Sequence, residues 1–280
     1  MGQQKKNAME LPLKKQQKLL KDYGPWAVVT GASSGIGKEI AVQLAASGLN
    51  LIINARRNEL LHQLALFLQT TYKVEVLSIS GDVTSEETQD QLTSQAEIKD
   101  IGLFVAAAGF GTSGQFIKNT LKTEKEMLAL NCGAVLRLTH IFANLFSEKK
   151  RGGIILLSSI VAFQGTPHAA HYAATKAYVQ TLAEGLHIEL KPFGVAVLAA
   201  SPGPVHSEFA ARANMQLGKA MYPDEVGISI LKSLGKKRTA YPGLLTKILI
   251  ASLSLLPRFG KIQIMKLVMG GMTKHQSKNA

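Results

Sequence analysis

Short apolar runs alternate with longer segments of helical composition along most of the chain. The apolar runs predict strands at Trp26–Thr30, Asn50–Asn54, Val74–Ile79, Ile101–Ala107, Ile154–Ser158 and Val195–Ala200, and a last one at Thr239–Tyr241. The segments between them predict helices at Ile36–Ser47, Glu59–Thr70, Ser85–Ile98, Thr123–Ser147 and His171–Leu190. Strands that are apolar throughout and alternate with helices are typical of a parallel sheet with both faces covered. The pattern therefore predicts one doubly wound α/β domain with about seven strands, although it loosens after Gly203.

The first predicted strand runs directly into a glycine-rich loop that opens a helix. Three glycines allow a sharp turn, a close approach of the backbone to a phosphate, and tight packing of helix on strand. The free N–H groups at the start of the helix then face an anion. Ordinary turns also use such glycines, so the loop alone is weak evidence. We expect nucleotide contacts from Thr30, Gly31, Ser33, Ser34, Gly35, Ile36 and Gly37.

Charge is spread unevenly over the 280 residues, whose net charge is +13. Residues 1–25 carry six lysines against two acidic residues, and residues 226–280 carry ten lysines or arginines and no acidic residue. Such basic ends can meet nucleic acid, an anionic membrane surface or solvent. We do not expect nucleic acid, because the ends contain few aromatic residues to stack on bases.

Cysteine content and the length of the apolar runs limit the class of protein further. The single cysteine, Cys132, excludes an intrachain disulfide, and no group of Cys, His and carboxylate residues has metal-ligand spacing, so we expect no metal. Residues 1–25 resemble a short basic amphipathic helix broken at Gly24-Pro25, not a secretory signal. The longest uncharged apolar run, Ile248–Leu256, is about half as long as a membrane span. A cytoplasmic protein is expected, with contact to a membrane surface as an option.

A tyrosine and a lysine lie one turn apart on the last long predicted helix. Tyr172 and Lys176 share one face of that helix. An adjacent ammonium would lower the pKa of Tyr172 from its usual value near 10 and make the phenol a general acid for a carbonyl oxygen. Most such pairs are merely solvated contacts. This pair gains weight from Ser159, which follows the preceding strand.

Together these motifs resemble the short-chain dehydrogenase/reductase family over residues 26–205. The loop Thr30–Gly37 resembles the family's Thr-Gly-x-x-x-Gly-Ile-Gly motif, and Tyr172 with Lys176 resembles its Tyr-x-x-x-Lys pair. The resemblance implies a single Rossmann-like domain with the catalytic residues Asn131, Ser159, Tyr172 and Lys176. It also implies cofactor contacts from Tyr172, Lys176, Ala108, Gly109 and the Pro-Gly turn, which comprises Pro202, Gly203 and Val205.

One motif departs from the family, and another resembles one branch of it. The family's Asn-Asn-Ala-Gly is Ala106-Ala107-Ala108-Gly109 here, which removes two bracing asparagines but no proton-transfer group. The stretch Tyr23–Thr30 resembles the long-chain 3-oxoacyl reductase and hydroxysteroid dehydrogenase branch. That similarity favours acyl or polycyclic carbonyl substrates.

The end of the second predicted strand indicates which nicotinamide cofactor binds. An acid that binds the ribose 2′-hydroxyl of NAD is expected about twenty residues after the glycine motif. Ala55 stands there, followed by Arg56 and Arg57. Arginine holds a phosphate through a planar fork of donors, so the cofactor is expected to be NADP(H). Ordinary surface arginines are the alternative. Asp82, followed by Val83, resembles the family's contact to the adenine ring.

The resemblance implies hydride transfer between NADP(H) and a carbonyl or alcohol. Tyr172 would protonate the oxygen, Ser159 would polarise the carbonyl, and Lys176 would lower the tyrosine pKa and hold the nicotinamide ribose. Asn131 would hold a water that relays protons. A non-catalytic NADP(H) sensor or membrane-surface scaffold is the alternative. An epimerase or dehydratase usually has a larger C-terminal substrate domain than this chain offers.

The region after the Pro-Gly turn is expected to select the substrate. Residues 204–222 predict an apolar lid, which favours a lipophilic carbonyl substrate. The basic and apolar tail, 244–280, is expected either to lie on an anionic membrane or to pack on the domain or a partner subunit. We therefore divide the chain into a basic extension (1–25), a catalytic domain (26–243) and this tail. The resemblance also implies a homodimer or homotetramer formed through Thr123–Ser147 and His171–Leu190.

Overall fold

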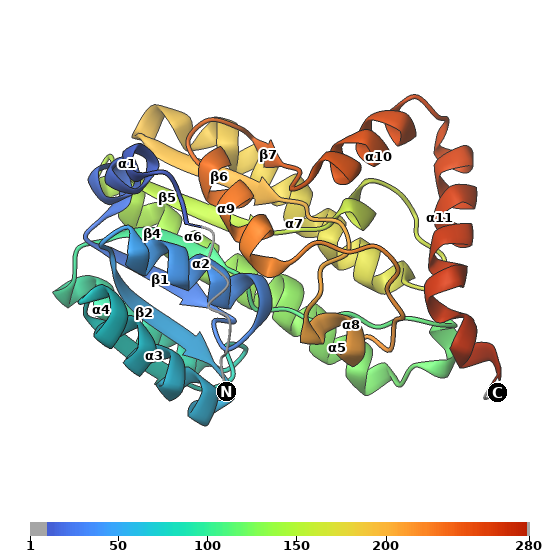
Figure 1. Ribbon diagram of the computed structural model, residues 1–280, viewed down its shortest axis with the longest axis horizontal. Coiled ribbons are helices and arrows are strands. Elements are labelled where there is room, and N and C mark those ends of the chain that lie inside the picture. The colour runs from blue at the N-terminus through green and yellow to red at the C-terminus, as the bar shows by residue number, and fades with distance from the viewer. Residues whose placement is uncertain (1–9, 279–280) are drawn as a thin grey trace, which may run out of the picture.

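A single seven-stranded parallel sheet forms the centre of the molecule (Figure 1). The computed structural model describes residues 10–278, so the first nine residues of the predicted basic extension and the last two of the tail lie outside the described residues. The strands have the order β3-β2-β1-β4-β5-β6-β7. Their bounds are β1 Trp26–Thr30, β2 Asn50–Ala55, β3 Val76–Ser80, β4 Ile101–Ala106, β5 Gly152–Leu157, β6 Val195–Ala200 and β7 Thr239–Ala240. The predicted doubly wound α/β fold is confirmed.

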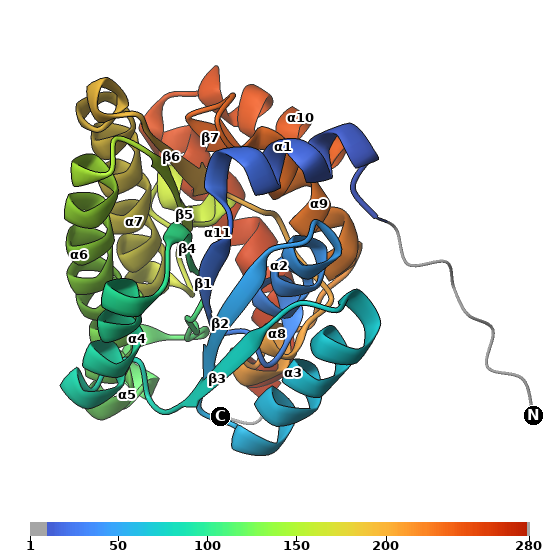
Figure 2. The ribbon, with the colours of Figure 1, turned by 90° about the vertical axis from the view of Figure 1, so that its left-hand side faces the viewer.

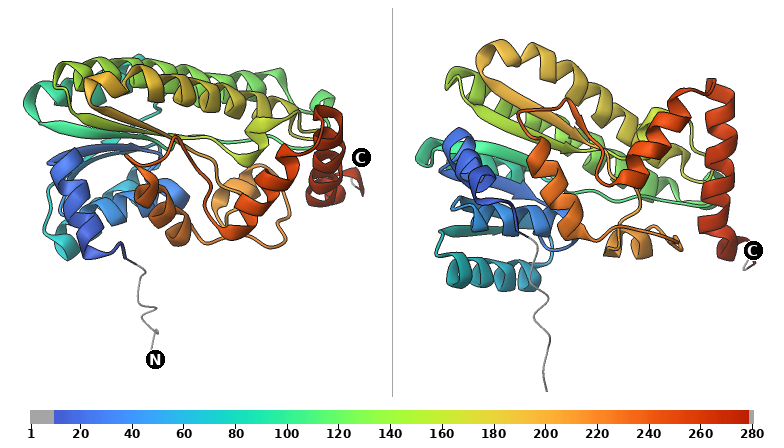
Figure 3. Two further views of the ribbon diagram at one scale, coloured as in Figure 1. Left: turned by 90° about the horizontal axis from the view of Figure 1, so that it is seen from above. Right: turned by 45° about the horizontal axis from the view of Figure 1, so that its top comes forward.

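Helices cover both faces of the sheet, as Figures 2 and 3 show. Successive side chains of a strand point to opposite faces. In β1, Ala27 and Val29 therefore join one core while Trp26 and Val28 join the other. The first core is completed by α1 (Leu13–Tyr23), α2 (Gly35–Ala46), α3 (Asn58–Tyr72) and α9 (Pro223–Ser233), and the second by α4 (Glu86–Ile98), α6 (Val135–Glu148) and α7 (Ala170–Glu189). Burial on both faces explains why the strands are apolar throughout.

The helix predicted as one piece over Thr123–Ser147 has three parts. It consists of α5 (Leu121–Leu128), a π-helical turn (Ala129–Ala134) and α6. A π turn inserts a residue into the helical ladder and often marks a functional site. Asn131 lies in this turn and is fully buried.

By length and composition alone, the whole helical stretch Leu121–Glu148 is long and apolar enough to cross a membrane, although charged residues interrupt its apolar runs. Phe142 and Phe146 are fully buried against the sheet, as expected for a core helix.

After Gly203, where the sequence pattern loosens, the structure contains the helix α9, which was not predicted. This helix begins with Pro223, followed by Asp224 and Glu225 in the first turn. Proline at the first helical position and acids in the first turn are standard helix-start signals. Gly227 lets α9 approach α2 closely, because a Cβ there would lie 3.0 Å from Cγ of Glu39. The contact closes the first core.

The predicted N-terminal helix is present as α1 and ends before Gly24. Leu19 and Tyr23 are buried, and Lys15 is nearly so, with its Nζ donating to the Leu234 carbonyl over 3.4 Å. Burial and the nearby charge of Lys236 lower the pKa of Lys15 to about 8. The extension thus packs on the domain through its apolar side.

Folding stability is expected to rise with pH from about 8 to 10.5, in part through Lys15. In that range the unfolded chain binds a proton at Lys15 that the folded protein has lost, so raising the pH favours the folded state. One such site contributes at most about 1.4 kcal/mol per pH unit. Urea unfolding across this range should give a smaller slope for Lys15→Met than for the wild type. The pKa of Lys176 is also lowered to about 8, so part of the increase in the free energy of unfolding with pH should remain in both proteins. Equal slopes would contradict the assignment to Lys15.

Two helices follow β7 and form a hairpin at one end of the molecule (Figure 1). They are α10 (Leu244–Ser254) and α11 (Arg258–Thr273). Leu253, Met265 and Met269 are buried in a third apolar cluster with Val161 and Ala173. One side of the predicted tail therefore packs on the domain. The division of the chain at residues 25 and 243 stays a prediction.

Candidate active site

The glycine-rich loop lies between β1 and α2, at the carboxyl edge of the sheet. Gly31 and Gly35 have φ values of 68° and 58°, which favour glycine. A Cβ at Gly37 would lie only 2.4 Å from the Gly31 carbonyl oxygen. The loop can close tightly only with glycine at these positions. The α2 N-terminus behind it provides the free N–H groups that suit a phosphate.

Thr30 connects this loop to the end of β4, where the chain departs from the family motif. Its hydroxyl oxygen accepts hydrogen bonds from the N–H groups of Ala107 (3.2 Å) and Ala108 (3.3 Å). Ala106 is buried in the second core. Nearby, the Asn54 side chain donates to the Ile79 carbonyl across 2.9 Å. These contacts brace the edge without the family's two asparagines.

Two arginines follow β2 at the same edge. Arg56 faces Asp82 at 3.9 Å, and both side chains are about half exposed. Arg57 donates to the Ser33 hydroxyl over 3.1 Å and pairs with Glu208 at 2.7 Å. The glycine-rich loop, the two arginines and Asp82 thus lie at the same edge of the sheet. The N–H donors of the loop and of the arginines suit the phosphates of a dinucleotide, and the Asp82 carboxylate suits its adenosine.

The four residues of the predicted catalytic set come from three separate segments. Ser159 follows β5, Tyr172 and Lys176 lie on α7, and Asn131 lies in the π turn. The Lys176 ammonium donates to the Leu157 carbonyl over 2.7 Å and lies 5.9 Å from the centre of the Tyr172 ring. Asn131 donates to the Phe110 carbonyl (2.9 Å) and accepts from the Phe110 N–H (3.2 Å). It therefore fixes the loop after β4.

The predicted lowering of the Tyr172 pKa by Lys176 was wrong for this structure. Burial raises the pKa of Tyr172 well above its usual value of 10, and a hydrogen bond with Ser159 offsets only part of that rise. The Lys176 ammonium points to the Leu157 carbonyl instead of the phenol. Burial also lowers the pKa of Lys176 to about 8. Tyr172 is therefore protonated at neutral pH, which is the state a proton donor needs.

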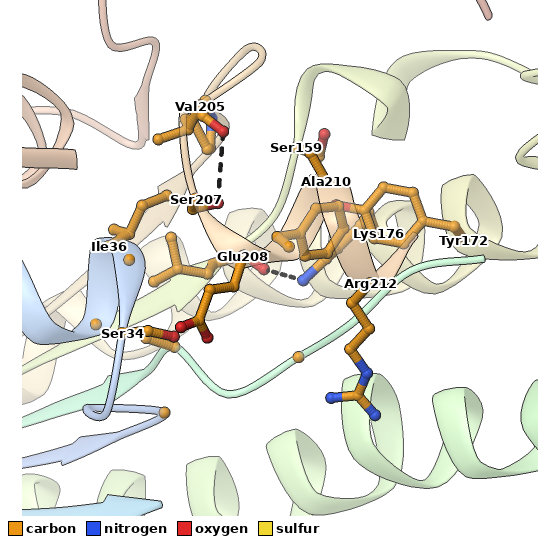
Figure 4. Close-up of a pocket in the computed structure, with 18 of the residues that line it drawn as sticks. Ser34, Ile36, Ser159, Tyr172, Lys176, Val205, Ser207, Glu208, Ala210 and Arg212 are labelled. Atoms are coloured by element: carbon orange, nitrogen blue, oxygen red, sulfur yellow. Dashed lines mark hydrogen bonds between the residues drawn. The ribbon is translucent and has the colours of Figure 1, made fainter. Parts of the chain in front are cut away.

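A cavity of about 670 Å³ joins these groups. Figure 4 shows Glu208 beside Ser34 on one side of the cavity, and Tyr172 and Lys176 beyond Ala210. Of the predicted site residues, Thr30 and Asn131 are buried and do not line the cavity. The others line the cavity: Gly31, Ser33, Ser34, Gly35, Ile36, Gly37, Arg56, Arg57, Asp82, Val83, Ala108, Gly109, Ser159, Tyr172, Lys176, Pro202, Gly203 and Val205. Their individual roles stay predictions.

The lid over this cavity carries charges that the sequence analysis did not single out. Its short helix, α8 (Glu208–Arg212), holds Glu208 against Arg57, and Phe209 packs 5.3 Å from the Tyr172 ring. Arg212 lies 4.1 Å above the Phe110 ring. A glutamate and an arginine on either side of the three apolar residues Phe209, Ala210 and Ala211 could have suggested contacts at both ends of α8.

The C-terminal helix closes the apolar side of the cavity, which the sequence analysis also missed. Met265, Met269 and Met272 of α11 line the cavity together with Met215 of the lid. Backbone and side chains connect the two segments. The Gln216 N–H donates to the Met272 carbonyl (2.9 Å), and the Gln276 amide donates to the Asn214 carbonyl (2.6 Å). Methionine side chains adapt to varied apolar shapes.

Comparison with known proteins agrees with this geometry. The family model described as short chain dehydrogenase matches residues 25–218. The chain is 30% identical over 229 residues to a 7beta-hydroxysteroid dehydrogenase of Clostridium sardiniense, covering 80% of this chain and 88% of the relative.

Other relatives are longer than this chain. It is 35% identical over 185 residues to a very-long-chain 3-oxoacyl-CoA reductase of Meyerozyma guilliermondii, covering 62% of this chain and 54% of that protein. It is 34% identical over 200 residues to the human inactive hydroxysteroid dehydrogenase-like protein 1, covering 70% and 60%. The chain thus spans little more than half the length of these two relatives.

A solved structure is similar over nearly the whole fold. The short-chain dehydrogenase from Sphingobium yanoikuyae in complex with NADPH has a TM-score of 0.75 and 29% identity, covering 84% of this chain and 97% of that one. The chain belongs to the short-chain dehydrogenase family, in its hydroxysteroid dehydrogenase and 3-oxoacyl reductase branch.

Proposed function

We propose that this protein reduces a lipophilic ketone or aldehyde with NADPH, and runs the reverse alcohol oxidation under suitable conditions. The observation that carries the proposal is that one cavity joins the phosphate-binding edge, the residues Ser159, Tyr172 and Lys176, and a side lined by methionines. Membership of the family supports an oxidoreductase that acts on hydroxyl or carbonyl groups. The NADPH preference, the lipophilic substrate and the role of Tyr172 are the proposed part.

The residues divide the proton chemistry among them. When bound, the nicotinamide supplies the hydride that reaches the carbonyl carbon. Tyr172 donates its proton to the carbonyl oxygen, and Ser159 donates a hydrogen bond to the same oxygen and polarises the carbonyl. Lys176, whose pKa is about 8, exchanges protons readily near neutral pH and returns one toward Tyr172. Asn131 positions the loop at Gly109 beside Lys176: a Cβ at Gly109 would lie 3.0 Å from Oδ1 of Asn131 and 3.5 Å from Nζ of Lys176.

Selectivity for NADPH is proposed to come from Arg56 and Arg57. The structural relative complexed with NADPH supports that choice. Within residues 10–278, the ion pair of Arg56 is a long contact to Asp82 (3.9 Å), so its guanidinium can reorient toward a 2′-phosphate. The guanidinium of Arg57 already forms an ion pair with Glu208 at 2.7 Å.

Replacement of Arg56 is expected to affect NADPH binding selectively. A hydrogen bond to a charged group contributes about 1.5–3 kcal/mol, so Arg56→Ala should raise the Kd for NADPH by about 10–100-fold. The Kd for NADH, which has no 2′-phosphate, should stay nearly unchanged. Calorimetric titration with both cofactors measures this. Arg238→Ala, at an arginine with comparable exposure on the β7 side, is the matched control. Equal losses for the two cofactors would contradict the 2′-phosphate contact.

Substrate class is tested by NADPH consumption across ketones graded by chain length and ring number. Because the lid and α11 line the cavity with apolar side chains, kcat/KM should rise with the apolar area of the substrate. Rates that favour small polar ketones or sugars would contradict the lipophilic assignment.

A non-catalytic NADP(H)-binding protein is the second candidate. It is supported by the relative named inactive and by Ala106 and Ala107 in place of the family's asparagines. The presence of Ser159, Tyr172 and Lys176 in one cavity supports the enzyme instead. Tight NADPH binding without turnover of any ketone would favour the second candidate.

The subunits are proposed to form a homodimer or homotetramer through α5–α6 and α7. Leu128, Leu136 and Ile188 are exposed there, at 48–62% of their surface, which suits an interface. Sedimentation analysis of the full chain measures the state.

A further inference from the structure

The helical hairpin α10–α11 exposes an apolar surface at the end of the molecule that carries the cavity. We name as the tail surface the outward residues Leu244, Ile248, Leu255, Phe259 and Leu267, which are 55–87% exposed. Single exposed apolar residues are common on soluble proteins, but a contiguous group marks an interaction site.

The tail surface is one side of an amphipathic arrangement. In α10 and its C-cap residue Leu255, the exposed residues Leu244, Ile248, Ala251 and Leu255 follow one another at intervals of four, three and four, so they form one stripe along the helix. Leu253 faces the other way and is buried. In α11, Met265 and Met269 point inward while Leu267 points outward. One apolar face of the hairpin is therefore packed on the domain, and a second apolar face is exposed.

Basic residues accompany this apolar face without acidic ones. Lys247, Arg258, Lys261 and Lys266 lie on the hairpin, and residues 226–280 contain no Asp or Glu. Among the described residues, the ion pairs do not involve any of these four side chains. A basic amphipathic surface is complementary to anionic lipid headgroups above an apolar interior.

The tail surface is continuous with the cavity. Leu245 and Val268 line the cavity and are also 50% and 43% exposed, so they belong to both the cavity wall and the outer surface. A compound that leaves an apolar phase at this surface would reach the methionine-lined side without crossing the charged end of the site.

From these observations we propose that the tail surface docks on an anionic phospholipid bilayer and that lipophilic substrate reaches the cavity from that bilayer. The delivery step rests on the proposed function, whereas the docking does not. A bilayer fits better than a second copy of the chain, because a two-fold contact would place the same basic residues against one another without acids to neutralise them. The N-terminal basic helix α1 lies at the opposite end of the molecule (Figure 3) and buries Leu19, so docking is assigned to α10–α11 alone.

Docking is tested by sedimentation of the full chain with vesicles of phosphatidylcholine alone or mixed with phosphatidylglycerol. The wild type should bind the mixed vesicles much more tightly, and salt should weaken that binding. Leu255→Glu with Leu267→Glu should lower the partition coefficient by at least about tenfold, because each change removes a leucine from the bilayer and adds a negative charge. Lys247→Gln with Lys266→Gln should lower it by about 25-fold, roughly fivefold for each charge.

Ile98→Glu is the matched control, since Ile98 is 78% exposed on α4, on the other side of the molecule. It should bind vesicles like the wild type. Thermal unfolding and turnover of a water-soluble ketone should be unchanged in both double variants, because none of the four residues lines the cavity. That readout separates failure of docking from failure of the proposed enzyme.

Delivery is tested with a ketone dissolved in the vesicles. Mixed vesicles should raise kcat/KM for this ketone in the wild type and not in Leu255→Glu with Leu267→Glu. Equal vesicle binding by the wild type and the leucine variant, or no binding by either, would overturn the docking proposal. Loss of a dimer in the leucine variant without any vesicle binding would also overturn it and assign the surface to a second copy of the chain.

Discussion

Tyr172→Phe is expected to lower kcat for ketone reduction by about 10²–10⁴-fold. The substitution removes the phenol hydroxyl and keeps the ring, whose packing against Phe209 at 5.3 Å holds the lid. Tyr172 carries its proton at neutral pH, because its usual pKa is near 10 and burial raises it further, so the wild-type side chain can donate that proton. Phenylalanine cannot donate that proton, and no other residue of the proposed set lies in the same position.

Cofactor binding separates loss of chemistry from loss of structure in this variant. The Kd for NADPH should change by no more than about threefold, because the phosphate-binding edge is untouched. Tyr178→Phe is the matched control on the same helix, since Tyr178 is 39% exposed and does not line the cavity. It should retain wild-type turnover. Near-normal turnover by Tyr172→Phe would contradict the assignment of the proton donor.

Phe142→Ala is expected to destabilise the fold by about 3–5 kcal/mol. Phe142 of α6 is fully buried, stacks on Phe104 of β4 at 4.6 Å and lies 5.8 Å from the Phe146 ring. Removal of the Phe142 ring leaves a cavity between α6 and the sheet, which the rigid rings of Phe104 and Phe146 cannot fill well. Urea unfolding measures the loss in free energy of unfolding.

Phe193→Ala is the control for that measurement, because Phe193 is 50% exposed. It should cost well under 1 kcal/mol. An equal loss for the two variants would contradict the placement of α6 in the core. Because α6 continues from the π turn that holds Asn131, we also expect weaker turnover by Phe142→Ala near its unfolding midpoint.

The features that could be predicted from sequence are those whose cause is local. Strands buried on both faces must be apolar, so β1, β4, β5 and β6 were predicted to within one or two residues. The glycine loop was also predictable, because Gly31 and Gly35 adopt backbone conformations that favour glycine. Ser159, Tyr172 and Lys176 were found by their spacing and family resemblance.

The features that were missed depend on contacts between distant segments. The π turn at Asn131 has no pattern of its own, since its residues are also compatible with an α-helix. The pKa of Tyr172 depends on burial beneath the lid and on the direction of the Lys176 ammonium, which points to the Leu157 carbonyl. The methionines of α11 line the cavity only because the hairpin folds back over it. The spacing of residues along the chain does not indicate that a distant segment folds back over the cavity.

The most direct test of the central claim is transfer of deuterium from NADPH labelled at its hydride position to an apolar ketone. Mass spectrometry of the alcohol produced by the wild type should find one deuterium on the carbinol carbon, while Tyr172→Phe should give little labelled alcohol although it still binds the cofactor. Unlabelled alcohol, or tight NADPH binding with no alcohol formed from any ketone, would contradict the assignment of this protein as a carbonyl reductase.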